Sequence, residues 1–156
     1  MLQILILCTG NTCRSPMAQL LLQERIKEAE MTHAFTVKSA GLAAFPGQAA
    51  SAGAAQAMKS RGIDAKMHRS RLLTEDDLVS ADLILTMTQG HKNQVLQLFP
   101  KAKSKVFTLA EYTGNLADVS DPFGGDLAEY ERCARMLSEL VDLAWEKLQT
   151  SAGKNQ

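Results

Sequence analysis

The chain has 156 residues, 46% of them hydrophobic, with 17 basic and 17 acidic side chains. A chain of this length can bury a complete core in one domain, so it needs neither disulfides nor a structural metal to fold. Its zero formal net charge argues against a general role at nucleic acids or membrane surfaces, and no apolar run approaches the ~18 residues of a membrane helix. We expect one domain over residues 1–149, followed by a flexible tail at residues 150–156.

Apolar runs alternate with amphipathic stretches along the chain, which is typical of a parallel sheet with helices on both faces. We predict four strands, at Leu2–Leu7, Phe35–Ala40, Leu83–Met87 and Val106–Leu109. The fold class is therefore α/β, a single domain built on a four-stranded parallel sheet.

Helices are expected between the strands. The first is predicted at Pro16–Glu30, the second is alanine-rich and ends near Gly62, and the third follows Thr88. The last helix is the longest and should close the core with apolar residues spaced three and four apart. These are Leu127, Tyr130, Ala134, Leu137, Val141, Ala144 and Leu148.

The most informative segment lies between the first strand and the first helix, where residues 8–16 read CTGNTCRSP. Ser15 and Pro16 are predicted as the N-cap and first position of the helix. A loop that runs into a helix N-terminus can direct its backbone N–H groups at one anion, and Arg14 adds a planar guanidinium. We predict a phosphate-binding loop formed by Thr9, Gly10, Asn11, Thr12, Cys13, Arg14 and Ser15.

Cys8 is the predicted nucleophile of this loop. Thiols at helix N-termini or beside cations lose their proton readily, so Cys8 should be largely thiolate at neutral pH. A thiolate can attack phosphorus to form a phosphocysteine, while Arg14 and the loop amides stabilise the phosphoryl oxygens. Packing is the alternative for a cysteine at the end of a buried strand, but Arg14 at this spacing favours the nucleophile.

The reaction also needs a proton donor, and residues 118–126, DVSDPFGGD, carry three carboxylates on an expected loop. Pro122 restricts the backbone of Asp121, which should hold that side chain outward. We predict that Asp121 protonates the leaving group and then, as the carboxylate, activates water. Asp118 and Asp126 are alternative acids, and either can instead be a turn former, a helix cap or an acceptor for a cationic substrate.

Four pieces of the sequence together resemble the low-molecular-weight protein tyrosine phosphatase family. They occur in the family's order and span nearly the whole chain: Cys8 to Ser15, Ser39-Ala40-Gly41, His68 to Arg71, and Asp121-Pro122. The resemblance implies the same catalytic roles for Cys8, Arg14 and Asp121.

The resemblance also implies the residues that support the loop. Asn11 should hold the loop's shape through hydrogen bonds to Ser39 and His68, and the Ser15 hydroxyl should stabilise the Cys8 thiolate. In this family a cysteine beside the nucleophile can form a protective disulfide with it on oxidation, which would pair Cys13 with Cys8; the alternative is that Cys13 only packs beneath the loop.

Two departures from the tyrosine-specific members bear on the substrate. Those members generally carry an aliphatic residue at the position of Thr12, and aromatic residues after Asp-Pro where this chain has Phe123 before two glycines. Both differences leave less apolar surface around the substrate side chain. A phosphotyrosine ring needs such surface, whereas a phosphoarginine guanidinium needs hydrogen-bond acceptors and little steric crowding. The chain is thus most similar to the bacterial protein arginine phosphatase branch.

This branch implies arginine-phosphorylated proteins as substrates, functional opposition to a protein kinase and a part in the stress response. Tyrosine-phosphorylated proteins are the alternative substrates. A phosphate-binding module without turnover would not need Asp121, and arsenate reduction typically needs a cysteine pair near residues 80–90, where this chain has none. No cofactor, nucleic-acid partner or membrane partner is expected.

Other reactive side chains have structural interpretations. Three cysteines fit no disulfide framework, which favours a cytoplasmic location, and Cys133 should pack in the last helix. The three histidines are too scattered for a metal site, and His33 and His91 are expected on the surface. Phe45 either lines the pocket mouth or anchors a loop in the core. A basic cluster at Lys66, Arg69 and Arg71 is expected to be solvated surface.

Overall fold

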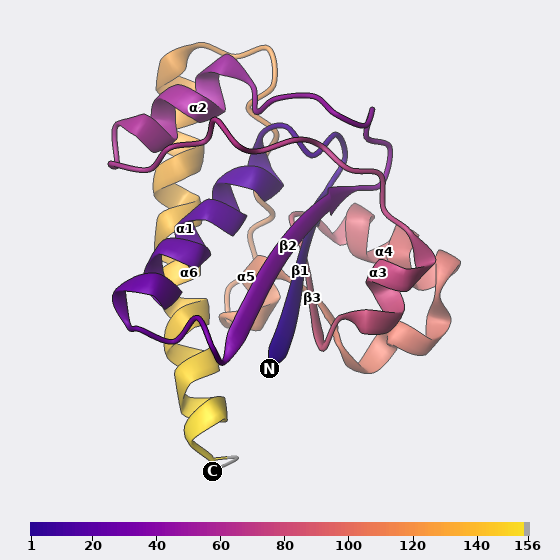
Figure 1. The fold of residues 1–156 in the computed structure, drawn as a ribbon. Helices are drawn as coiled ribbons and strands as arrows, with labels where there is room; N and C mark the ends of the chain where they lie inside the picture. Colours follow the sequence, from indigo (N-terminus) through magenta and orange to yellow (C-terminus); the bar gives the residue numbers. More distant parts are fainter. Residues whose placement is uncertain (155–156) are drawn as a thin grey trace.

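A computed structural model describes the backbone of residues 1–154 and the side chains of residues 1–151 (Figure 1). Strands and helices alternate for most of the chain, and a long helix completes it. In chain order the elements are β1 (Leu2–Cys8), α1 (Arg14–Glu28), β2 (Phe35–Gly41), α2 (Ala52–Lys59), α3 (Glu75–Ser80), β3 (Leu83–Thr86), α4 (Gln89–Leu98), the 3-10 helix η1 (Pro100–Ser104), β4 (Val106–Thr108), α5 (Leu109–Tyr112) and α6 (Leu127–Lys154).

The four strands form one parallel sheet in the order β2-β1-β3-β4, which confirms the predicted fold class. One edge of β1 pairs with β2 from Leu2 opposite Phe35 to Cys8 opposite Gly41. The other edge pairs with β3, which the chain reaches only later. Open α/β sheets bind ligands at such a switch point, beyond the carboxyl ends of the strands, and Cys8 lies there.

Side chains of β1 alternate between two cores, so both faces of the sheet are covered. Ile4, Ile6 and Cys8 belong to the core that includes α1 and α6, whereas Leu5 and Leu7 belong to the core that includes α3 and α4. Figure 1 shows α1, α2 and α6 on one side of the sheet and α3 and α4 on the other. The predicted placement of helices on both faces is confirmed.

The first helix begins two residues before the predicted Pro16. Arg14 is its first residue and Cys13 is the N-cap, without a side-chain capping bond. Ser15 does not cap the helix because its hydroxyl contacts the thiol of Cys8 and the side-chain amide of Asn11. The last two residues of the phosphate-binding loop, Arg14 and Ser15, are consequently also the first two residues of the helix.

The short helices α3, η1 and α5 were not predicted, because segments of four to six residues carry no helical periodicity. A signal was nevertheless present for two of them. Thr74 and Asp77 form a capping box at α3, and Thr108 and Glu111 form another at α5. The second box is also why β4 ends at Thr108, one residue before the predicted Leu109.

The long helix α6 has the predicted apolar face apart from its first member. Leu127 was predicted to face the core but is 58% exposed, because the packed face of the helix begins at Tyr130. The helix also continues through Lys154, where a flexible tail had been expected from residue 150; Thr150 donates a hydrogen bond to the carbonyl of Glu146 (3.0 Å). Residues 155 and 156 of that tail lie outside the described residues. Within the described part of the chain, no helix has the length and apolar character to span a membrane.

Candidate active site

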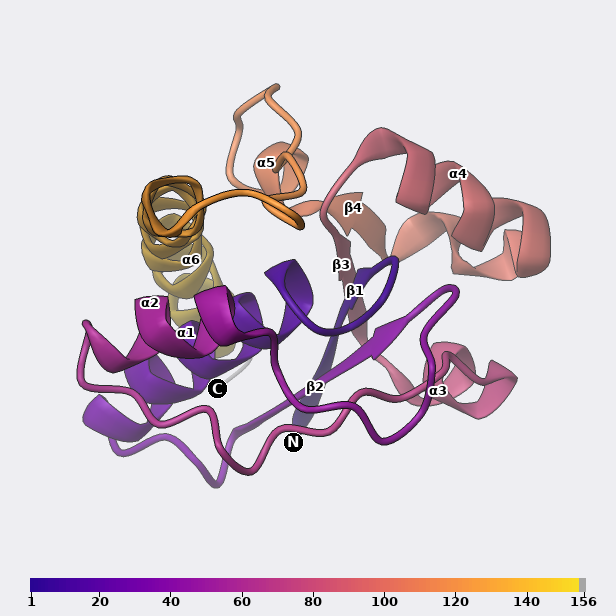
Figure 2. The same ribbon diagram turned by 90° about the horizontal axis from the view of Figure 1, so that it is seen from above.

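The loop between β1 and α1 lies at the carboxyl end of the sheet. Figure 2 looks onto this end, where the loop faces the segment that follows β2 and the segment that precedes α6. Within the described chain, no acceptor is hydrogen bonded to the backbone N–H groups of residues 9–14. These amides and the N-terminus of α1 are therefore available to an anion, as the sequence predicts.

Asn11 gives the loop its shape. It is fully buried and has a left-handed backbone (φ 57°), a conformation that asparagine tolerates better than most residues. Turns that contain a left-handed residue can point successive N–H groups at one anion. The conformation costs on the order of 1 kcal/mol, so the surrounding contacts must hold it in place.

Four groups hold Asn11. Its side-chain amide donates to the hydroxyls of Ser15 (2.8 Å) and Ser39 (2.9 Å), and its Oδ1 accepts the N–H of Arg71 (2.9 Å). Its backbone carbonyl lies 2.7 Å from Nε2 of His68. The predicted contacts with Ser39 and His68 are thus present, and the Arg71 amide is an additional one.

Gly41 explains the Ser39-Ala40-Gly41 motif. A Cβ at this position would lie 2.6 Å from the carbonyl oxygen of Thr9 and 2.7 Å from the Cβ of Ala44. Because only glycine lacks that atom, the end of β2 can pack directly against the phosphate-binding loop. The close approach lets Ala43 donate its N–H to the same carbonyl of Thr9 (2.9 Å).

The thiol of Cys8 lies at the base of this loop. Its sulfur is 2.9 Å from the hydroxyl of Ser15, the contact that the family resemblance implies. The residue is only 3% exposed, since it also belongs to the core beneath α1 and α6. A thiolate at this position could accept a hydrogen bond from the Ser15 hydroxyl.

Arg14 is positioned by a residue that the sequence did not indicate. Its Nη1 donates to the carbonyl of Val119 (3.0 Å), and the N–H of Val119 donates to the carbonyl of Met87 at the end of β3 (3.0 Å). The side chain of Val119 is buried, and its hydrogen bond to Met87 attaches the loop before α6 to the sheet. Both contacts use its backbone, and no side-chain pattern could reveal them.

The pinned loop brings Asp121 to the site. Its Oδ2 is 3.6 Å from Nη2 of Arg14, and half of its side chain is exposed. Its other oxygen accepts the N–H of Phe123 (3.0 Å). The structure thus brings Asp121, more than 100 residues away in the sequence, to the loop that carries Cys8 and Arg14.

The alternative acids have other partners. Asp118 accepts the N–H of Gln89 (3.1 Å), and Asp126 accepts the N–H of Glu129 (3.0 Å) in the first turn of α6. Asp126 therefore caps the N-terminus of α6, one of the roles that the sequence allows for it. Among the three carboxylates, Asp121 is the one that pairs with Arg14.

The candidate specificity residues are accessible to a substrate. Thr12 is partly exposed in the middle of the loop, and Phe123 is 74% exposed and adjacent to Asp121, whose carboxylate accepts its N–H. Phe45 is 77% exposed, so its interpretation as a core anchor is wrong.

His91 was predicted at the surface, but it is buried, 6% exposed. Its Nε2 lies 2.8 Å from the hydroxyl of Thr9 in the phosphate-binding loop, and its buried Nδ1 has no hydrogen-bond partner within the described residues. The prediction failed because the first turn of α4 lies against the loop that follows β1, where His91 contacts Thr9. His33 is exposed as predicted.

Both histidines at the loop should make stability depend on pH. Burial lowers the pKa of His68 and of His91 below 6.5; the charge of Arg14 adds to this for His91, while Asp118 and Asp121 oppose it. Below that pH the unfolded chain therefore binds more protons than the folded chain, and stability falls as pH falls. We expect the free energy of unfolding in urea to decrease by up to about 1.4 kcal/mol per pH unit for each imidazole.

The variant His91→Asn should lose its share of this pH dependence, whereas His33→Asn, at an exposed position, should keep the full slope. An unchanged slope in His91→Asn would show that this imidazole is not held neutral by the fold.

The two other cysteines are buried. Cys13 contacts the hydroxyls of Ser51 (3.3 Å) and Tyr130 (3.6 Å), so it links the loop to α2 and α6. Burial raises the pKa of Cys133 to about 12, which agrees with its predicted packing role. The described residues contain no group of three His, Cys, Asp or Glu side chains arranged to hold a metal.

Comparisons with known proteins agree with this geometry. The family model described as low molecular weight phosphotyrosine protein phosphatase matches residues 3–154. A curated protein-arginine-phosphatase of Geobacillus stearothermophilus is 43% identical over 149 residues, which is 95% of this chain and 97% of the relative. The protein-tyrosine-phosphatase PtpB of Staphylococcus epidermidis is 38% identical over 141 residues, 90% of this chain and 95% of the relative.

A solved structure extends the similarity to three dimensions. The YwlE arginine phosphatase from Geobacillus stearothermophilus superposes with a TM-score of 0.91 at 41% identity, covering 100% of this chain and 98% of the other.

Proposed function

Because the chain belongs to the low molecular weight phosphotyrosine protein phosphatase family, we propose that it is a cysteine-dependent protein phosphatase whose substrate is phosphoarginine in proteins. One observation carries the chemistry. The thiol of Cys8 lies at the base of a loop whose amides have no hydrogen-bond acceptor among the described residues, with the Arg14–Asp121 pair beside it. A nucleophile, an anion-binding cradle and a proton donor are the groups that a two-step phosphoryl transfer requires.

The first step transfers the phosphoryl group to the enzyme. The thiolate of Cys8 attacks phosphorus, an S–P bond forms, and the P–N bond of phosphoarginine breaks. Asp121 donates its proton to the departing nitrogen, so the arginine side chain leaves as its guanidinium. Arg14 and the loop amides stabilise the negative charge on the equatorial oxygens.

The second step releases phosphate. Asp121, now a carboxylate, removes a proton from water as the water oxygen attacks phosphorus. The S–P bond breaks, inorganic phosphate departs, and the thiolate is restored with its hydrogen bond from Ser15. Asp121 is again protonated, so one carboxyl group serves both steps.

Two features support phosphoarginine as the substrate. Thr12 presents a hydroxyl in the middle of the phosphate-binding loop, and a guanidinium can donate a hydrogen bond to it. The relative from Geobacillus stearothermophilus carries the name protein-arginine-phosphatase over nearly the same length. Phosphotyrosine is the second candidate, because the Staphylococcus epidermidis relative is named a tyrosine phosphatase at 38% identity.

The substitution Thr12→Ile tests this choice. We expect the native chain to have the higher kcat/KM for a phosphoarginine peptide than for a matched phosphotyrosine peptide. The isoleucine should shift the ratio of the two values toward phosphotyrosine by ~5- to 150-fold, since a lost hydrogen bond and an added apolar wall are together worth ~1–3 kcal/mol. Steady-state kinetics on both peptides measures the ratio.

Thr12→Val is the matched control, because it removes the hydroxyl while keeping the shape of the side chain. If the kcat/KM ratio shifts in both variants, the preference for phosphoarginine depends on the hydrogen bond to the Thr12 hydroxyl. If it shifts in Thr12→Ile alone, the preference depends on the space around the substrate side chain. Equal or faster hydrolysis of phosphotyrosine by the native chain would reject the arginine assignment and leave the tyrosine phosphatase.

We also propose a cytoplasmic enzyme that opposes a protein kinase in the stress response and is inactivated by a disulfide between Cys8 and Cys13. Both cysteines are free thiols here. These parts of the function rest on the family resemblance and stay predictions.

A further inference from the structure

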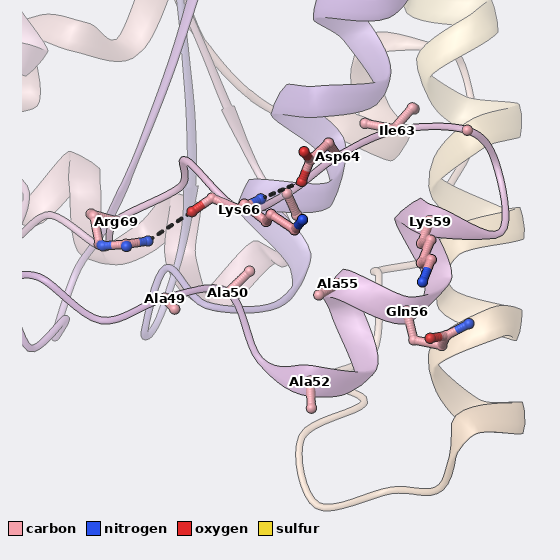
Figure 3. Close-up of a pocket in the computed structure, with 12 residues that line it drawn as sticks. Ala49, Ala50, Ala52, Ala55, Gln56, Lys59, Ile63, Asp64, Lys66 and Arg69 are labelled. Atoms are coloured by element: carbon pink, nitrogen blue, oxygen red, sulfur yellow. Dashed lines mark hydrogen bonds between the residues drawn. The ribbon is translucent and has the colours of Figure 1, made fainter.

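A groove lies beside the phosphate-binding loop, outside the residues assigned to catalysis. It measures about 760 Å³ and runs between α2 with its preceding segment and the connection of residues 62–69 (Figure 3). On the α2 side it is lined by four alanines, Ala49, Ala50, Ala52 and Ala55, together with the longer side chains of Gln56 and Lys59. Short side chains leave room for an extended backbone to approach closely.

The rim of the groove is positively charged. Lys59, Lys66 and Arg69 line it together with one carboxylate, Asp64, which accepts the backbone N–H of Lys66 (2.9 Å). Arg69 donates to the carbonyls of Lys66 (2.9 Å) and His68 (2.6 Å). Within residues 1–151, none of the three cations forms an ion pair with a carboxylate.

Both walls of the groove are attached to the phosphate-binding loop. Ser51, next to Ala50, donates its N–H to the carbonyl of Thr12 (2.9 Å). His68, next to Arg69, lies 2.7 Å from the carbonyl of Asn11. A chain bound with its phosphorylated side chain in the loop would therefore reach the groove within a few residues, because an extended chain advances ~3.3–3.6 Å per residue.

We propose that this groove binds an acidic segment of the substrate protein, adjacent to the phosphorylated residue. The inference rests on the proposed protein phosphatase function, and it adds a preference for acidic neighbours. Three cations against one carboxylate that is already hydrogen bonded favour an anionic occupant, and the alanine wall fits an extended peptide. The basic residues Lys66 and Arg69, predicted to be solvated surface, become a substrate-binding surface.

Kinetics on paired peptides test the proposal. Two phosphorylated peptides share the phosphorylated residue and differ only in their flanks, one with Asp and Glu, the other with Asn and Gln. We expect a lower KM for the acidic peptide. The double variant Lys59→Glu with Lys66→Glu should raise that KM by ~3- to 10-fold and leave kcat unchanged, with a smaller effect at high salt. The neutral peptide and p-nitrophenyl phosphate should be unaffected.

The matched control is Lys101→Glu with Lys103→Glu, which makes the same change in net charge at exposed positions of η1 away from the groove. An equal rise in KM in the control would attribute the effect to overall charge and overturn the proposal. Equal KM values for the two peptides on the native chain would overturn it as well.

A binding measurement separates the groove from the catalytic assignment. Unphosphorylated acidic and neutral peptides are titrated into isotope-labelled protein, and backbone amide shifts are followed by NMR. We expect shifts at residues 49–56 and 62–69 with the acidic peptide only. If these shifts occur but no phosphopeptide is hydrolysed, the phosphatase function is refuted and the groove remains a binding site for acidic peptides. If phosphopeptides are hydrolysed but there are neither shifts nor a KM difference, the phosphatase function stands and the groove proposal is refuted.

Discussion

Cys8→Ser is expected to lower kcat by on the order of 10⁴–10⁶-fold, the usual cost of removing the nucleophile from a covalent catalyst. A serine hydroxyl stays protonated at neutral pH, and its neighbour here, the hydroxyl of Ser15, cannot take that proton. The hydroxyl can still contact Ser15, which lies 2.9 Å from the native sulfur, so the loop should keep its shape. The variant should therefore fold normally and bind phosphate without turning over substrate.

Thermal unfolding and phosphate titration check this prediction together. Inorganic phosphate should raise the melting temperature of Cys8→Ser, because a ligand that binds only the folded state stabilises it. Cys8→Ala serves as the control without any hydroxyl and should behave in the same way. Retained turnover in either variant would assign the nucleophile elsewhere, whereas loss of phosphate binding in both would show that the loop had collapsed.

The fold was predictable because its signals are carried by side chains. The apolar run of β1 and the alternation of strands with helices specify a parallel sheet, and that topology alone places Cys8 at the switch point. The start of α1 was predicted two residues too late. Ser15 and Pro16 are favourable both as N-cap and first residue and as members of the first turn, so the local sequence does not show which of these positions they occupy. Only the hydrogen bonds of Ser15 to Cys8 and Asn11 explain the earlier start.

The site was predictable to the extent that the family motif names its side chains. Cys8, Arg14 and Asp121 were indicated by type and spacing, and the structure brings them together. Val119 and His91 were missed for different reasons. Val119 acts through its backbone, and His91 is a polar residue whose burial depends on how α4 meets the end of the sheet. Such contacts arise from the packing of distant segments, which residue types do not encode.

Asp121→Asn should lower kcat by ~10²–10⁴-fold on substrates with a poor leaving group and by much less on p-nitrophenyl phosphate. An asparagine keeps the size of the side chain but cannot donate a proton to the departing atom or remove one from water. The nitrophenolate leaves readily without a proton, whereas the guanidine nitrogen of phosphoarginine needs one. The ratio of kcat values on the two substrates therefore reports acid catalysis directly.

Asp118→Asn and Asp126→Asn are matched controls, because they make the same chemical change on the same loop. Asp118 accepts a hydrogen bond from the N–H of Gln89, and Asp126 accepts one at the start of α6; an asparagine oxygen can accept both, so these variants should keep the native leaving-group dependence. Full activity of Asp121→Asn on both substrates would move the acid to one of these two residues. Equal losses on both substrates would instead give Asp121 a positioning role through Arg14, which lies 3.6 Å away. The substrate comparison thus distinguishes the proton donor from a residue that only orients the guanidinium.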